Sequence, residues 1–550
     1  MFSRFRSWWP AIACTLCYYA VVSICAYVGT RTTEGHIVYP LDDAYIHMAM
    51  AKNFSAHGVW GYTRYAFSSS TTSPLWTALL AIGYFSLGQN EWLPLFFNIL
   101  IGTIFIFYLF HLFREEVSPV TGFLLLLAIA AATSVPALTL LGMEHLLHTL
   151  LTLAFVCCSA KALAQRDEAR ADTRLLLLLA ALLPMARYEG CFAVATVCLL
   201  LSLQKGYRRA ITLALAGAIP VLVYGAISVL QGWLFLPNSI LLKGTRPVFS
   251  SFPAILDSLG GHSIAVLTAT PVMLVLLVFA LVTCGFRDKD DPLDNNSKTW
   301  WGAATFIFIM FLHLQFANVG WLFRYEAYLV AVGLAFTLPT LCQLGNTLLP
   351  RLTPLRLNRV PVLISALGLI ALCFPLAERG MRAFVDTRTS MHDRYLEHIQ
   401  PARFVREYYP ASTVVVNDIG AVAYFADCRL LDLYGLGNME PMRFRMSKSG
   451  YTKQDFDEWT TRENADIGIL QVEWDEVWSR IPDSWVEVAE WKIPSNVVFG
   501  DRRIGFFAIQ PDTADALASH ILAFRSELPV EIEVQMMLGS PNKPDAGAGN

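Results

Sequence analysis

The sequence predicts a polytopic α-helical membrane protein, with about eleven transmembrane helices, followed by a mixed α/β domain. Two observations predict the membrane part. Of the 550 residues, 55% are hydrophobic and only 15% are charged, and many apolar runs are long enough to cross about 30 Å of hydrocarbon. A third observation predicts the second part, because strand-like runs replace long apolar ones near the C-terminus. We expect a transmembrane domain over residues 1–377 and an extracytoplasmic α/β domain over residues 378–538.

The first apolar run, Trp8–Val28, follows two arginines and lacks a small-residue cleavage site, so we expect a retained anchor. Polar residues 187–190 interrupt the run from Thr173 to Leu203, which predicts two short helices meeting at a bend that lines a cavity. Pro74–Leu87 is also short and is expected to lie along the membrane surface. The other candidate spans are Glu91–Phe113, Val120–Leu140, His145–Ala164, Ala210–Leu230, Ser263–Cys284, Trp300–Ala317, Tyr325–Leu344 and Val360–Leu376.

Basic residues between the spans predict the topology. The positive-inside rule is satisfied by about eleven crossings when the N-terminus is cytoplasmic. The segments then assigned to the cytoplasmic side are Arg4–Arg6, Arg114, Lys161–Arg174, Lys205–Arg209, Arg287–Lys298 and Arg351–Arg359. Every polar motif discussed below then falls on the opposite face, together with the α/β domain. This agreement predicts that the motifs form one site at the outer membrane surface.

The C-terminal part contains five strand-like runs among helical stretches, which predicts a mixed sheet. These runs are Thr413–Val416, Leu430–Leu433, Ile467–Val472, Trp485–Trp491 and Ile504–Ile509. Gly435-Leu436-Gly437 lacks the strand and helix of a nucleotide-binding motif and is expected to be a turn. Residues 539–550 are rich in Pro, Gly and Asn, and we expect a disordered tail there.

The polar stretch Leu41–Trp76 lies in the first expected extracytoplasmic loop, residues 30–90. Asp42 and Asp43 open a segment with helical potential, where acidic side chains favour the positive end of the helix dipole. His47 follows one turn later, and Trp60 is one of several aromatic residues before a hydroxyl-rich run. A carboxylate pair, aromatic rings and hydroxyls are typical of a sugar-binding site. The alternative is a solvated loop with a helix cap and an interfacial aromatic belt.

Other charged residues near membrane depth are candidates because such placement is energetically costly. Glu144 is either a site carboxylate or a helix-start acid. Arg187 either binds a phosphate or pairs with Glu189 to stabilise the bend. The remaining candidates have equally simple alternatives: Lys243 as a snorkelling anchor, Arg324 and Tyr325 as a rim of the aromatic belt, and His47 as a satisfied surface histidine.

Several motifs resemble GT-C glycosyltransferases, most closely the bacterial branch that includes terminal arabinofuranosyltransferases. The residues from Asp42 to Ile46, from Ala51 to Asn53 and from Thr72 to Trp76, with Gly58, resemble that branch's first extracytoplasmic loop. Four later segments are similar to its other motifs, although His145 and Tyr188 replace a threonine and a proline. These segments are Gly142–Glu144, Ala186–Gly190, Pro237-Asn238-Ser239 through Lys243, and Asp418–Ala421 with Leu431–Leu436.

The resemblance implies a hexosyl- or pentosyltransferase of the EC 2.4 class in the bacterial inner (plasma) membrane. Its donor would be a polyprenyl-phosphate sugar, and its acceptor a cell-envelope glycan, lipid or protein. By resemblance Asp43 or Asp42 is the base, and we favour Asp43. The substrate-binding candidates are His47, Trp60, Glu144, Arg187, Glu189, Asn238, Lys243, Arg324 and Tyr325.

The chemistry requires no cofactor, although the adjacent acids Asp42 and Asp43 are able to bind a divalent cation. Inversion is the simplest stereochemical course, because a single displacement suffices. Membrane lipids are expected partners, whereas a net charge of −3 without long basic runs argues against nucleic acid. Two alternatives remain: a flippase for a lipid-linked saccharide, although no internal repeat is visible, and a non-catalytic polymer-assembly subunit.

Overall fold

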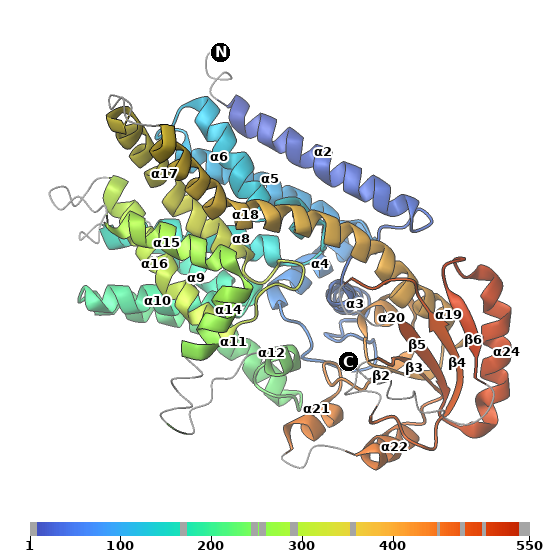
Figure 1. Ribbon diagram of the computed structural model, residues 1–550. Helices are drawn as coiled ribbons and strands as arrows, with labels where there is room; N and C mark the ends of the chain where they lie inside the picture. Colours follow the sequence, from blue (N-terminus) through green and yellow to red (C-terminus); the bar gives the residue numbers. More distant parts are fainter. Residues whose placement is uncertain are drawn as a thin grey trace.

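The computed structural model describes residues 8–164, 173–243, 251, 260–285, 295–352, 359–447, 452–473, 479–497 and 502–537. Its N-terminal part is a bundle of helices, and its C-terminal part is a sheet flanked by helices (Figure 1). The predicted architecture, a polytopic helical membrane protein with a C-terminal α/β domain, is therefore confirmed. The predicted tail at residues 539–550 lies outside the described residues.

Five helices in the described part are long and apolar enough to cross a membrane. They are α2 (Trp9–Arg31), α5 (Leu93–Phe113), α8 (His145–Ala164), α11 (Tyr207–Leu230) and most of α16 (Asn295–Phe316). A bent pair, α14 (His262–Ala269) and α15 (Pro271–Gly285), would make a sixth span. Other predicted crossings fall on shorter apolar helices: α6 (Pro119–Ala132), α9 (Thr173–Ala186), α10 (Gly190–Leu203) and the start of α17 (Ala327–Leu352). The number of eleven crossings stays a prediction.

Prolines divide two of the spans that we predicted as continuous. The run Val120–Leu140 forms α6 and a separate short helix, α7 (Val135–Leu140), because Pro136 lacks the N–H that would continue α6. Pro271 likewise separates α14 from α15, which meet at 102°. The predicted break at residues 187–190 is confirmed, since it lies between α9 and α10.

Helix α18 (Arg359–Arg394) joins the bundle to the C-terminal domain and contains the predicted boundary at residue 377 (Figure 1). It continues into a π-helical turn, η3 (Tyr395–Ile399), and then into α19 (Gln400–Tyr408). The bundle and the domain are therefore connected by nearly continuous helical chain.

The C-terminal domain is built on a six-stranded sheet in the order β2-β1-β3-β5-β4-β6. The strands are β1 (Thr413–Val416), β2 (Arg429–Asp432), β3 (Ile467–Gln471), β4 (Val486–Lys492), β5 (Arg503–Ala508) and β6 (Glu533–Met536). Strand β1 pairs in parallel with β2 and β3, and the other pairings are antiparallel. Five of these strands were predicted within about one residue, whereas β6 was missed because its edge residues alternate between exposed and half-buried.

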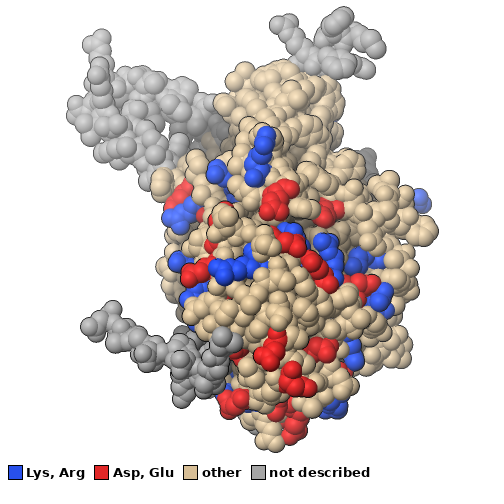
Figure 2. All heavy atoms as spheres, turned by 90° about the vertical axis from the view of Figure 1, so that its right-hand side faces the viewer, with Lys and Arg blue, Asp and Glu red and all other residues tan. Residues whose placement is uncertain are grey.

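Helices cover both faces of this sheet. Phe404 of α19 packs against Trp491 and Phe506 on one face, where Phe524 of α24 (Ala514–Phe524) also lies. Trp459 of α22 (Lys453–Arg462) belongs to the hydrophobic cluster on the other face. Figure 2 shows Lys and Arg (blue) intermingled with Asp and Glu (red) over the lower part of the face that carries this domain. Few charged residues are visible among the tan residues at its upper end.

Helix α3 (Asp42–His57) lies between the bundle and the C-terminal domain (Figure 1). It packs on α4 (Pro74–Leu87) on one side and on α20 (Gly420–Phe425) on the other. The polar loop after α3 also reaches the domain, where the hydroxyl of Tyr62 donates to the carbonyl of Leu430 at 2.9 Å. The start of α3 is thus held by both halves of the protein.

Candidate active site

The two adjacent aspartates at the start of α3 have different environments. Asp42 is 3% exposed, and its carboxylate accepts hydrogen bonds from the backbone N–H groups of Gly420 (2.5 Å) and Ala421 (2.7 Å). A side chain at Gly420 would collide with Asp42, because an added Cβ would lie 2.2 Å from its backbone oxygen. Asp42 therefore joins α3 to the start of α20.

Burial, and then the neighbouring Asp418 carboxyl, raise the pKa of Asp42 well above its ordinary value. Nearby His398 and the backbone N–H of Ala421 lower this pKa and so oppose the shift only in part. A carboxyl group that is buried, hydrogen-bonded and resistant to ionisation is poorly suited to accept a proton from a substrate. This environment favours Asp43 over Asp42 as a candidate base.

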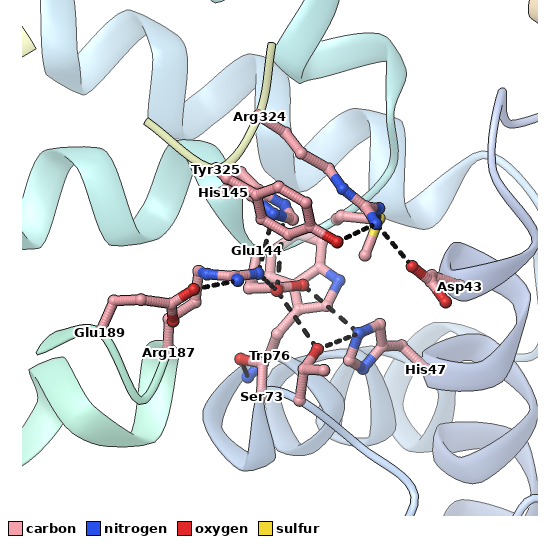
Figure 3. Close-up of polar contacts among 12 residues, drawn as sticks. Asp43, His47, Ser73, Trp76, Glu144, His145, Arg187, Glu189, Arg324 and Tyr325 are labelled. Carbon is pink, nitrogen blue, oxygen red and sulfur yellow. Dashed lines mark hydrogen bonds and ion pairs between the residues drawn. The ribbon is translucent and has the colours of Figure 1, made fainter. Parts of the chain in front are cut away.

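The side chain of Asp43 points toward Arg324 (Figure 3). Its Oδ2 lies 2.8 Å from Nη2 of Arg324, and its side chain is 20% exposed. The Arg324 side chain is only 2% exposed, and it also donates to the hydroxyl of Tyr325 at 3.0 Å. Asp43 is thus a partly accessible carboxylate held in position by a buried cation.

An unusual backbone turn positions Arg324. The residues Trp321, Leu322 and Phe323 all have positive φ angles, between 50° and 59°. Left-handed backbone costs about 1–2 kcal/mol for each non-glycine residue, so its surroundings must stabilise this turn. Buried Arg379 of α18 does so by donating to the carbonyl of Phe323 and by pairing with Glu326.

A second network surrounds Glu144, directly before α8. The Glu144 carboxylate lies 2.6 Å from Nη1 of Arg187 and 3.3 Å from Nε2 of His47. Arg187 also pairs with Glu189 at 2.5 Å. The alternative that His47 is a surface histidine is wrong, because its side chain is 2% exposed and contacts Thr77 of α4 and Thr71 of the hydroxyl-rich run. Arg187 therefore forms the predicted pair with Glu189 at the bend and also contacts Glu144 of a distant motif.

The ring of Tyr325 connects these two networks. Its centroid lies 4.8 Å from the guanidinium carbon of Arg324 and 5.5 Å from that of Arg187. Both distances fit cation–π contacts. Figure 3 shows that the side chains of Arg324 and Tyr325, which come from one loop, point toward those of Glu144 and Arg187, which come from two other segments.

Two cavities meet at Asp43. The larger, of about 670 Å³, is lined by the start of α3 and by the C-terminal domain, including Asn417, Asp418 and Tyr434. The smaller, of about 450 Å³, lies among α10, α11, α16 and α12 (Asn238–Lys243), and Arg187 is on its wall. The residues common to both linings are Asp43, Ala317, Asn318, Arg324 and Tyr325. The structure therefore gathers six of the predicted site residues around these cavities: Asp42, Asp43, Arg187, Glu189, Arg324 and Tyr325.

Three other candidates lie differently. Trp60 donates to the hydroxyl of Tyr224 at 3.2 Å and lines neither cavity. Asn238 is fully buried and donates to the carbonyl of Gly435 at 2.8 Å, so it links the bundle to the domain. Lys243 ends α12, but its side chain lies outside the described residues.

The turn predicted at Gly435–Gly437 forms part of the larger cavity. Gly435 has a φ of 93°, and its neighbours Tyr434 and Leu436 line the cavity wall. Asp432 at the end of β2 holds the turn by accepting the backbone N–H groups of Tyr434 and Gly437, each at 2.7 Å. Burial raises the pKa of Asp432 to about 6.

Sequence reasoning missed two residues near this cavity. Asp418 was recognised only as part of a recurrent motif, and His398 was not singled out. The Nε2 atom of His398 lies 2.9 Å from Oδ2 of Asp418. No local pattern could have revealed their approach to Asp42, because the three residues come from segments far apart along the chain.

A family model described as a domain of unknown function (DUF8728) matches residues 387–508, within the C-terminal domain. No curated protein matches the chain. Two crystal structures of ArnT from Cupriavidus metallidurans, one bound to undecaprenyl phosphate and one in the apo state, are 14% and 13% identical, with TM-scores of 0.47 and 0.48. Each comparison covers 90% of this chain, and 97% and 98% of those chains.

Proposed function

We propose that this protein is a membrane glycosyltransferase that moves a sugar from a polyprenyl-phosphate donor to an extracytoplasmic acceptor. One observation carries the proposal: a partly exposed carboxylate, Asp43, lies with the buried cation Arg324 on the wall shared by two cavities. Transfer between two bound substrates needs such a group at the point where they meet.

The smaller cavity suits the lipid-phosphate donor. Apolar side chains make up much of its wall, among them Phe192, Val221 and Phe316, and they match the isoprenoid chain. Arg187 and Arg324 flank Tyr325 at its polar end. A planar guanidinium is the side chain best suited to binding phosphate oxygens. The lipid would enter between α10, α11 and α16.

The larger cavity suits the acceptor, because polar side chains of both halves of the protein line it. The acceptor hydroxyl transfers its proton to the Asp43 carboxylate while its oxygen forms a bond to the anomeric carbon. The bond between that carbon and the phosphate oxygen breaks, and the electron pair leaves with the polyprenyl phosphate. A single displacement of this kind inverts the anomeric configuration.

Fixed positive charge stabilises the leaving phosphate. Arg324 lies beside Asp43 and is held by the turn at residues 321–323, so little reorganisation is needed as charge develops. Removing one such transition-state partner typically costs about 3–4 kcal/mol, or a hundredfold to a thousandfold in rate. Arg187 stays close to Glu144 and Glu189, which limits its freedom and orients its guanidinium.

The positive-inside pattern orients the protein in the bacterial inner membrane, with the cavities and the C-terminal domain outside. The acceptor is then a cell-envelope glycan, lipid or protein. The resemblance of the sequence motifs to terminal arabinofuranosyltransferases makes a polyprenyl-phosphate pentose the first donor to test.

Transfer can be tested with purified protein in nanodiscs and a radiolabelled polyprenyl-phosphate arabinose or hexose. Formation of a glycosylated acceptor, with release of polyprenyl phosphate, supports the proposal. A flippase would instead move the lipid-linked sugar across a vesicle membrane without forming a new bond. A non-catalytic assembly subunit would bind the lipid without either result.

A further inference from the structure

A mixed cluster of two carboxylates and an imidazole lies where the bundle meets the C-terminal domain. Its members are Asp42 of α3, His398 of η3 and Asp418 after β1. One ligand atom from each residue lies within 4.8 Å of those of the other two. It is the one group of three such residues with this spacing in the described part of the chain.

The distances fit a metal ion. Nε2 of His398 and Oδ2 of Asp418 are 2.9 Å apart. For an ion about 2.1 Å from each atom, the angle N–metal–O would be about 90°, as in octahedral coordination. Each oxygen of Asp42 accepts one backbone N–H, and a carboxylate oxygen has a second lone pair that can bind a cation.

Two charged side chains lie at the other ring nitrogen of His398. Nδ1 of His398 lies 3.3 Å from the Glu397 carboxylate and 3.2 Å from Nη1 of Arg394. A carboxylate on the second ring nitrogen orients a histidine ligand and increases its basicity. His398 is also part of a π-helical turn, a rare form of helix that is frequent at functional sites.

The charge of the larger cavity also favours a cation. Its described lining contains three carboxylates, those of Asp42, Asp43 and Asp418, but a single guanidinium, that of Arg324. Asp42 and Asp418 lie side by side, and a bound cation would relieve the repulsion between two such carboxylates.

We propose that Asp42, His398 and Asp418 bind one divalent cation of the Mn²⁺ or Mg²⁺ type at the wall of the larger cavity. Two carboxylates and one imidazole suit these ions, and both carboxylates line the cavity. The cation would connect α3 to the C-terminal domain next to Asp43. It would also supply positive charge for phosphate oxygens, a role that rests on the proposed function.

Binding can be measured without any substrate by electron paramagnetic resonance, because free Mn²⁺ gives a sharp signal that is lost on binding. Titration of the purified full chain in detergent with MnCl₂ should show saturable loss of signal corresponding to one ion per chain. His398→Gln and Asp418→Asn should each raise the dissociation constant at least tenfold. Glu397→Gln, which removes only the support of the imidazole, should raise it about tenfold.

Matched controls are available on the surface. His57→Gln and Asp512→Asn replace exposed residues of the same types and should leave Mn²⁺ binding unchanged. A wild-type protein that binds no stoichiometric Mn²⁺ overturns the proposal, whether or not the variants fold. Unchanged affinity in both His398→Gln and Asp418→Asn also overturns it. Sugar transfer is read separately, so failure of one proposal leaves the other standing.

Discussion

Replacement of Asp43 by asparagine is the sharpest test of the proposed base. Asparagine has nearly the same shape and keeps an oxygen that can accept the hydrogen bond from Arg324, which now spans 2.8 Å. It cannot take a proton from an acceptor hydroxyl. General-base catalysis contributes about 10²–10⁴-fold in rate, so we expect the barrier to rise by about 3–5 kcal/mol.

Single-turnover transfer from a radiolabelled polyprenyl-phosphate sugar measures this loss directly. The variant should still bind the donor, because the smaller cavity keeps its apolar wall. Binding can be monitored as a rise in the temperature of thermal unfolding. Asp427→Asn is a matched control, since Asp427 also pairs with an arginine, Arg64 at 2.7 Å, but on the exposed surface. That variant should transfer sugar within about twofold of wild type.

The reasoning is refuted if Asp43→Asn transfers sugar as fast as the control does. A slow Asp43→Asn variant that also unfolds far below the wild-type temperature would indicate a structural role instead. Removing one charge from a partly exposed pair should lower the free energy of unfolding by no more than about 1–3 kcal/mol.

Three further changes probe the surroundings of the site. Gly420→Ala should loosen the C-terminal domain, because its Cβ would collide with Asp42; faster limited proteolysis after residue 394 would reveal this, and unchanged proteolysis would contradict it. Glu144→Gln should destabilise the fold by about 1–3 kcal/mol, because Arg187 loses one of two carboxylate partners; an unaltered thermal midpoint would argue against this contact. Burial raises the pKa of Asp432 from 3.8 to about 6, so its native state holds the extra proton, and this contribution to stability is lost as pH rises from about 4 through 6. The free energy of unfolding, measured by chemical denaturation, should therefore fall between pH 4 and 7 in wild type. In Asp432→Asn this fall should be smaller by up to about 3 kcal/mol.

Local sequence signals were enough to predict most of the secondary structure. The buried strands β1 and β3 are short runs of Val, Ile and Leu between turn residues, and this pattern marks a strand without reference to the rest of the fold. The break at residues 187–190 was predictable for a similar reason, because charges cannot remain inside an apolar helix facing lipid. Prolines at the interruptions near residues 136 and 271 carried a usable signal that we did not apply.

The candidate site was predictable only in outline. Loop charge alone predicted that Asp43, Glu144, Arg187 and Arg324 share one face of the membrane, and the structure brings their side chains together (Figure 3). The partners within that face were not predictable, because Glu144 and His47 are far apart in the chain and no periodic pattern relates them. The different roles of Asp42 and Asp43 depend on the backbone of Gly420 and were equally hidden.

One arginine in α18 ties the geometry of the two halves together. Arg379 holds the strained turn before Arg324, and the same helix continues into the π-helical turn that carries His398, which lies close to Asp418 on the wall of the larger cavity. A tilt of this helix would shift the guanidinium of Arg324 and the imidazole of His398 together. A movement of the C-terminal domain would therefore reach Arg324 in the helical bundle without the closure of any loop.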